Sequence, residues 1–221
     1  MGLKGDHISH NENRELLRFE GLHQTYLPLC HYLHMSKLIY SVTSSLDGFV
    51  ADEAGNFDWT SPSEEVHSVV NDILKNVGTF LLGRRMYETL AVWDTIPSDG
   101  PSEAMNQFAN IWNAANKIVY SNSLMEVSTS NTTIERVFNA KAVHKLIAES
   151  DKDFGIGGPH LAADAIRAGI VDEFHQFIVP KIIGGGNHWL PKKVETELEL
   201  VELQKYENGI VYLQYKQARI Q

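Results

Sequence analysis

Residues 154–186 read Phe-Gly-Ile-Gly-Gly-Pro-His-Leu-Ala-Ala-Asp-Ala-Ile-Arg-Ala-Gly-Ile-Val-Asp-Glu-Phe-His-Gln-Phe-Ile-Val-Pro-Lys-Ile-Ile-Gly-Gly-Gly. A short apolar strand leads into Gly157-Gly158, Pro159 begins a helix, Gly169 ends it, and a second apolar strand runs to Pro180. Glycines at the first turn let the backbone approach an anion closely, and the free N–H groups of the helix favour negative charge. The unit therefore favours a nucleotide phosphate, although Gly-Gly-Pro also occurs in ordinary turns.

The composition is that of a globular protein. The chain has 221 residues, of which 43% are hydrophobic and 21% are charged, which is enough for one substantial core. The formal net charge of −9 argues against non-specific binding to nucleic acid or anionic membranes, because both need clustered Lys and Arg. No stretch reaches the roughly 18 to 20 apolar residues that span a bilayer, and no signal peptide is recognised. We therefore expect a cytoplasmic protein.

The first 34 residues differ in character from the rest. They are rich in histidine and show little apolar periodicity, whereas Met35 is followed almost at once by a clean strand at 38–42. We expect residues 1–34 to be a tail or an upstream extension and residues 35–221 to form one domain. Cys30 is the only cysteine, which excludes an internal disulfide framework and a cysteine-based metal site. No metal site is expected.

Strand and helix patterns alternate along the remaining chain. Asn208-Gly209 lies between the last two strand-like runs, and Asn-Gly is a strong hairpin signal. This order predicts an α/β fold with a mixed, mostly parallel sheet flanked by helices and an antiparallel hairpin at the C-terminal end. The predicted strands are 38–42, 79–82, 117–120, 133–138, a run before Gly157, a run ending at Pro180, 196–206 and 210–217; the predicted helices begin at Ser61-Pro62-Ser63-Glu64 and after Gly83, and span 102–114, 140–150 and the stretch between Pro159 and Gly169.

Six short motifs follow one another along the chain in a characteristic order and spacing. They are Ser45-Leu46-Asp47-Gly48, Leu82-Gly83-Arg84-Arg85, Lys117-Ile118-Val119-Tyr120-Ser121, Gly157-Gly158-Pro159, Val171-Asp172-Glu173, and Pro180 with Gly184-Gly185-Gly186. Together they resemble the dihydrofolate-reductase-like superfamily over residues 36–217. The closest resemblance is to the reductase domain of the riboflavin-biosynthesis deaminase-reductases and their stand-alone relatives.

The resemblance implies that NADPH is the cofactor and that two glycine turns hold it. Gly83 matches a turn that meets the adenine-side phosphates, and Ser121 matches a small polar residue near the 2′-phosphate. Gly157, Gly158 and Pro159 match the turn under the pyrophosphate. Each is a turn that offers N–H groups or hydroxyls to phosphate oxygens, which agrees with the reading from the residues themselves.

Three residues after Gly83 belong to the same turn. By resemblance Arg84 and Arg85 contact the cofactor phosphates, but both can instead pair with the surplus carboxylates of this acidic chain. Met86 stands where true dihydrofolate reductases commonly have Thr. The resemblance therefore leaves one expected hydrogen bond to the cofactor phosphate without its usual donor in this chain.

The resemblance gives three residues to the substrate side, of which Asp47 and Glu64 are the catalytic candidates. Asp47 can accept hydrogen bonds from the ring N–H groups of a pyrimidine or pteridine, or can cap its own Asp-Gly turn. Glu64 matches the substrate-binding carboxylate of dihydrofolate reductases, or forms a capping box with Ser61 as N-cap. Trp59 covers the substrate or nicotinamide, or anchors its loop to the core.

The resemblance therefore implies an NADPH-dependent reductase of a small heterocyclic substrate, similar to 5-amino-6-(5-phosphoribosylamino)uracil reductase. The alternatives are a dihydrofolate reductase-like or orphan reductase, and a nucleotide-binding protein without turnover. Phe49-Val50-Ala51 and Glu64-Glu65 stand where the riboflavin enzymes usually place basic residues, and these should repel a substrate phosphate. A homodimer is expected from the family, paired through sheet edges or the C-terminal ribbon.

Overall fold

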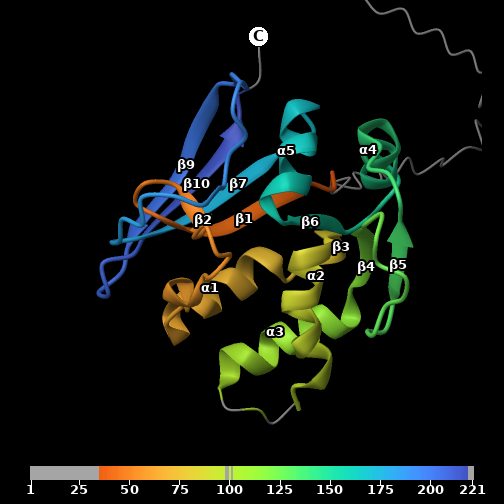
Figure 1. Ribbon diagram of the computed structural model, residues 1–221, viewed down its shortest axis with the longest axis horizontal. Helices are drawn as coiled ribbons and strands as arrows, with labels where there is room; N and C mark the ends of the chain where they lie inside the picture. Colours follow the sequence, from red (N-terminus) through yellow and green to blue (C-terminus); the bar gives the residue numbers. More distant parts are fainter. Residues whose placement is uncertain (1–34, 98–99, 101, 219–221) are drawn as a thin grey trace, which may run out of the picture. The chain divides into compact units, whose positions relative to one another are not determined.

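A computed structural model describes residues 35–97, 100 and 102–218 of the chain; the predicted tail at 1–34 lies outside these residues. Eight strands form one sheet in the order β5-β4-β3-β6-β1-β7-β10-β9, and β2 pairs with β8 in a small second sheet (Figure 1). The strands are β1 (Leu38–Ser45), β2 (Phe49–Ala51), β3 (Val77–Gly83), β4 (Asn116–Tyr120), β5 (Thr132–Glu135), β6 (Asp153–Gly157), β7 (Glu173–Val179), β8 (Asn187–His188), β9 (Leu198–Lys205) and β10 (Val211–Gln217). The helices are α1 (Glu64–Leu74), α2 (Arg84–Leu90), α3 (Glu103–Ala114), α4 (Ala140–Ala148) and α5 (Pro159–Arg167), with 3-10 helices η1 (Asp58–Thr60) and η2 (Ala91–Thr95).

Six of the eight strands of the large sheet run parallel, from β5 at one edge to β7. The hairpin β9–β10 continues the sheet in the antiparallel sense, with β10 paired to β7. The turn between β9 and β10 contains Gly209 at φ +84°, a left-handed conformation that suits glycine. The predicted α/β fold with a C-terminal hairpin is confirmed. The pairing of β2 with β8 was not predicted.

The central strands are apolar on both faces because helices cover both faces. On β3, Leu81 packs into a core cluster with the residues of α4 and α5, while Phe80 and Leu82 pack into a second cluster with those of α2 and α3. Figure 1 shows α4 and α5 on one side of the sheet and α1, α2 and α3 on the other. No helix among the described residues is long and apolar enough to cross a membrane.

Parallel pairing places the ends of β1, β3, β4, β6 and β7 at the same edge of the sheet, which we call the carboxyl edge. The opposite edge, where these strands begin, is called the amino edge. Ligands of open α/β sheets bind outside the carboxyl ends of the strands. The loops that follow these strands are therefore the first place to look for a site.

Candidate functional site

Two glycine turns lie side by side at the carboxyl edge. β3 and β6 are neighbours, with Leu82 opposite Gly157, so Gly83 and Gly158 follow on adjacent strands. A Cβ atom on Gly157 would stand 2.9 Å from Leu82 Cδ2 and from Met86 Cγ. Glycine at this position therefore lets the end of β6 lie directly against β3 and α2.

The second turn ends in a helix N-terminus. Gly158 is the N-cap of α5 with φ +96°, and Pro159 is the first residue of the helix. No described side chain accepts a hydrogen bond from the first turn of α5, so its N–H groups remain available for an anion. Gly157, Gly158 and Pro159 therefore have the geometry that a phosphate turn needs.

Arg84 begins α2 and is already paired. Its Nε donates to Glu88 Oε1 at 2.7 Å, and its Nη1 donates to Ser123 Oγ at 2.8 Å. Pairing with a carboxylate was one of the two expected roles of this arginine. Arg85 is exposed and makes no ion pair with the described residues. Met86, in place of the usual Thr, fills the space beneath the two glycine turns, 3.6 Å from where a Cβ on Gly158 would stand.

Ser121 organises the turn that follows β4. Its side chain is 8% exposed, and its Oγ accepts the N–H groups of Ser123 at 3.3 Å and Leu124 at 3.0 Å. Arg136, which follows β5, donates from Nη1 to the carbonyl oxygens of Ser121 at 2.8 Å and Leu124 at 2.7 Å. Sequence reasoning missed Ser123 and Arg136. The polar run Ser121-Asn122-Ser123 was a signal that could have identified Ser123, whereas no local pattern marks Arg136.

Asp47 lies at the end of β1 and binds a loop far away in the sequence. Its Oδ2 accepts the N–H of Gly184 at 2.8 Å, and both carboxylate oxygens lie 3.3 Å from the N–H of Ile183. The Ser45 hydroxyl, followed by the Gly184 and Ile183 amides, lowers the pKa of this carboxyl. Asp47 therefore stays ionised and joins the β1–β2 loop to the β7–β8 loop, rather than capping only its own turn.

The same two loops are joined at further points. The Leu46 N–H donates to the Lys181 carbonyl at 2.8 Å, and β2 pairs with β8. The rings of Phe49 and His188 lie 4.2 Å apart. Gly186, at φ +131°, passes so close to β2 that a Cβ there would stand 2.0 Å from the Ala51 carbonyl oxygen. We call this pair of joined loops, residues 45–56 and 180–189, the clasp; it forms one wall of the carboxyl edge.

The predicted capping box of Glu64 is wrong. The N-cap of α1 is Ser63, whose Oγ accepts the Val66 N–H at 3.4 Å. Glu64 Oε1 instead accepts the N–H of Ala104 at 3.0 Å, in the first turn of α3. This backbone hydrogen bond, together with one from the Ser102 side chain, lowers the pKa of Glu64. The carboxylate caps a different helix, and its role in substrate binding stays a prediction.

Trp59 lies in η1 and packs against a third core cluster beneath β7 and β10, which contains Phe177 and Tyr206. The Lys181 ammonium lies 5.9 Å from the centre of its ring. Its indole N–H is buried and has no hydrogen-bond partner among the described residues. Trp59 thus anchors its loop to the core, and its contact with a substrate stays a prediction.

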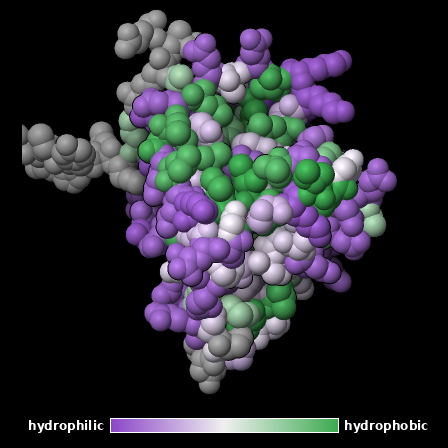
Figure 2. All heavy atoms as spheres, turned by 90° about the vertical axis from the view of Figure 1, so that its left-hand side faces the viewer, coloured by the Kyte–Doolittle hydropathy of each residue, from purple (hydrophilic) through white to green (hydrophobic). Residues whose placement is uncertain are grey.

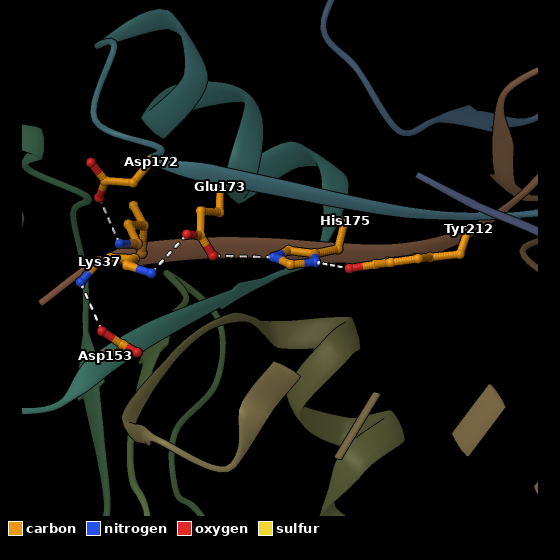
Figure 3. A network of polar contacts seen from close by, with 7 residues as sticks. Lys37, Asp153, Asp172, Glu173, His175 and Tyr212 are labelled. Atoms are coloured by element: carbon orange, nitrogen blue, oxygen red, sulfur yellow. Dashed lines mark hydrogen bonds and ion pairs between the residues drawn. The ribbon is translucent and has the colours of Figure 1, made fainter. Parts of the chain in front are cut away.

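The amino edge carries a second polar cluster (Figure 3). Asp172 and Glu173 belong to one of the six sequence motifs, but their partners in this cluster were not predicted. The backbone N–H groups of Lys37 and Leu38 donate to Asp153 at 3.0 Å and Asp172 at 2.8 Å. Glu173 accepts the Lys37 ammonium at 2.8 Å. These contacts fix the start of β1 between β6 and β7.

The cluster continues into the sheet. His175 lies between Glu173, 3.4 Å from its Nε2, and Tyr212, 2.8 Å from its Nδ1. His175 and Tyr212 are 3% and 2% exposed. The hydrogen bond from His175 is the largest of the effects that lower the pKa of Glu173 to about 2, while burial raises the pKa of Tyr212. A cleft of about 420 Å³ opens beside these residues, between α1 and the sheet. The arrangement satisfies buried polar groups at the edge opposite the glycine turns.

Known proteins resemble this chain throughout the described domain. The uncharacterized protein YyaP of Bacillus subtilis is 25% identical over 185 residues, covering 83% of this chain and 96% of YyaP. A pyrimidine reductase-like protein from Corynebacterium diphtheriae has a TM-score of 0.62 at 18% identity, covering 84% of this chain and 93% of that one. Dihydrofolate reductase from Enterococcus faecalis, solved with NADP(H), has a TM-score of 0.54 at 13% identity, covering 84% and 98%. The fold is therefore dihydrofolate-reductase-like. The family model of the RibD C-terminal domain matches residues 36–212, and the chain belongs to this family.

Proposed function

We propose that this protein is an NADPH-dependent reductase of a small heterocyclic substrate. The observation that carries the proposal is the pair of glycine turns on the adjacent strands β3 and β6, with an uncapped helix N-terminus at Gly158. Membership of the RibD C-terminal domain family supports a reductase. The nicotinamide supplies the hydride when it is bound, so the protein needs to contribute mainly orientation and exclusion of water.

The order of the strands suggests how a dinucleotide lies along the carboxyl edge. The pyrophosphate would bind the N–H groups at Gly157 and Gly158, at the end of β6. The turn after β4, with Ser121, Arg84 and Arg136, lies two strands away, which is about 10 Å at the usual strand spacing. This span suits the adenosine half of the nucleotide, whose 2′-phosphate would meet the arginines. The nicotinamide half would then extend toward β1 and the clasp.

In this proposal the clasp supplies the substrate side of the site. Asp47 is held ionised, and a carboxylate bound to two amides still has lone pairs that can accept ring N–H groups. Leu46 and Ile182 are 63% and 70% exposed, and offer apolar surface to a flat ring. Glu53 approaches Gly185 in the same wall. This mixture favours an uncharged or cationic heterocycle over the phosphoribosyl substrate of the riboflavin enzyme, which remains the reference reaction.

The first test is a fluorescence titration of the full chain with NADPH. Gly158→Asp places a negative charge in the phosphate turn and should weaken binding at least tenfold through charge repulsion and loss of the anion site. Gly169→Asp is the matched control, because Gly169 also has positive φ, at +67°, but lies at the other end of α5. Equal loss in both variants would indicate a folding defect. No binding by the unaltered protein would remove the reductase proposal and favour a non-catalytic role.

Turnover separates the remaining alternatives. Oxidation of bound NADPH by pyrimidine or pterin substrates would establish a reductase, and tight methotrexate binding would favour dihydrofolate reductase activity. Saturable NADPH binding without oxidation by any of these compounds would leave an orphan reductase or a nucleotide-binding protein. The decisive reading is the substrate-dependent loss of NADPH absorbance.

We also propose that the protein is a homodimer that pairs through β9. β9 is the last strand in the order of the large sheet and is paired on one side only. Its Leu200, Val201 and Leu203 are 50%, 49% and 62% exposed. Apolar side chains gather on this side of the molecule (Figure 2). An exposed apolar edge strand is unfavourable in a monomer. Light scattering after gel filtration should give the dimer mass for the unaltered protein and the monomer mass for Leu203→Lys, with Glu202→Lys, on the other face of β9, as control. A monomeric unaltered protein would contradict this.

A further inference from the structure

Two arginines from different elements bind the same short turn. Arg84, at the start of α2, donates to Ser123 Oγ at 2.8 Å. Arg136 donates to the carbonyl oxygens of Ser121 and Leu124 at 2.8 and 2.7 Å. A guanidinium has five N–H donors, so each arginine retains donors that no described residue uses. The turn after β4 therefore carries two fixed positive charges.

One of these charges is already neutralised. Glu88 Oε1 lies 2.7 Å from Arg84 Nε, and the two side chains are about equally exposed, at 45% and 46%. The order of the pair is the less favourable one for a helix, because Arg84 is at the positive N-terminal end and the acid lies four residues later. The pair therefore contributes little to the stability of α2. The pair also places a negative charge 2.7 Å from the Arg84 guanidinium.

The carboxylate of Glu88 also borders open space. A cleft of about 500 Å³ lies beside Glu88, with Tyr87, Glu88 and Ala91 from α2 and η2 and with Leu124, Glu126 and Val127 from the segment after β4. Because Glu88 Oε1 is bound to Arg84 Nε, a ligand group that binds the free donors of Arg84 lies close to this carboxylate as well. For a neutral group the carboxylate is an additional hydrogen-bond acceptor, whereas for a phosphate it is a repulsive charge.

We propose that Glu88 sets the nucleotide preference of this protein by weakening the attraction of Arg84 for the 2′-phosphate of NADPH. The inference rests on the proposed function, in which the adenosine half of the nucleotide lies at the end of β4. NADH has a hydroxyl at the 2′-position and is little affected by the carboxylate. Glu88 thus narrows the difference in affinity between the two nucleotides by weakening the binding of NADPH, while the binding of NADH stays nearly the same.

The size of the effect follows from Coulomb's law. A unit charge about 5 Å from a phosphate with nearly two negative charges, in a dielectric close to that of water and screened by salt, changes binding by roughly three- to tenfold. Glu88→Gln removes this charge and keeps the size of the side chain. The ratio of NADPH to NADH affinity should therefore rise by that factor.

The experiment measures dissociation constants of NADPH and NADH for the full chain by fluorescence titration at low ionic strength. The variants are Glu88→Gln and a matched control, Glu149→Gln. Glu149 also forms an exposed i,i+4 ion pair, with Lys145 at 3.7 Å at the end of α4. We expect tighter NADPH binding in Glu88→Gln alone, with NADH unchanged within about twofold on the same Coulomb argument. A purely structural role for Glu88 would move both nucleotides together.

Three other outcomes overturn the inference. If both nucleotides bind and the ratio is the same in all three proteins, Glu88 does not set the preference, and the reductase proposal stands. If the ratio falls in Glu88→Gln, the carboxylate orients Arg84 for the phosphate rather than competing with it. If neither nucleotide binds the unaltered protein, the proposed function and this inference fail together.

Discussion

The two edges of the sheet use their polar groups in opposite ways. At the amino edge, hydrogen bonds link Lys37 to Glu173, Glu173 to His175 and His175 to Tyr212. The backbone amides of Lys37 and Leu38 are bound to the Asp153 and Asp172 carboxylates. At the carboxyl edge, the amides at the start of α5 have no side-chain cap, and the arginines retain free donors. The same parallel strands are therefore fixed by polar contacts where they begin, whereas the turns where they end keep hydrogen-bond donors available for a ligand.

The largest expected change in stability comes from removing a carboxylate of the polar cluster at the amino edge. Glu173→Ala should lower the free energy of unfolding by about 3 kcal/mol, because it leaves the buried His175 without one partner and removes a partly buried ion pair. Glu199→Ala is the control, since Glu199 pairs with Lys216 at the surface and should change stability by less than about 0.5 kcal/mol. Urea unfolding measures both. Similar midpoints for the two variants would show that the buried cluster contributes little.

Acid should reproduce part of this effect in the unaltered protein. The pKa of Glu173 falls from the ordinary 4.5 to about 2 in the folded state, so its contribution is present above pH 4.5 and is lost as the pH falls toward 2. Between pH 6 and pH 3 this amounts to about 2 kcal/mol. Asp172, whose pKa is raised by burial, acts in the opposite direction. The pH dependence of unfolding should be shallower in Glu173→Ala; an equal slope would assign acid sensitivity to other carboxyls.

A substitution in the clasp should have a smaller effect on stability and should leave the polar cluster at the amino edge intact. Gly186→Ala drives a Cβ into the Ala51 carbonyl oxygen and should cost about 2 kcal/mol, chiefly by separating the loops of the clasp. Gly184→Ala is matched, because Gly184 also has positive φ but no atom within 4 Å of its Cβ position, and it should cost about 1 kcal/mol. Hydrogen exchange of the Ile183 and Gly184 amides reports the opening. Equal exchange in both variants would show that the close approach is unimportant.

The sequence predicted what depends on neighbours along the chain. The alternation of strands and helices and the Asn208-Gly209 hairpin are local signals, and the structure contains them. The glycine turns were predicted for the same reason, since Gly158 and Pro159 adjoin a strand and a helix. Local pattern also misled: Ser61 and Glu64 have capping-box spacing, yet Glu64 binds Ala104, forty residues later.

The residues that were missed depend on contacts across the sheet. Glu173 and His175 lie at alternate positions on β7, in a strand whose other residues are apolar apart from Gln176, and nothing nearby in the sequence marks Tyr212 as their partner. Arg136 reaches the end of β4 only because β5 pairs with it. β2 and β8 are too short for a periodic signal and exist because the clasp brings them together. Such contacts need the register of the whole sheet before they can be inferred.

The clasp has a consequence for how substrate preference can change. Its two loops, separated by more than a hundred residues, share a ladder, a carboxylate–amide contact and a point where Gly186 touches β2. An insertion in either loop alone would break the shared register. To transfer the substrate preference of a relative to this protein, both loops of the clasp must therefore be exchanged together.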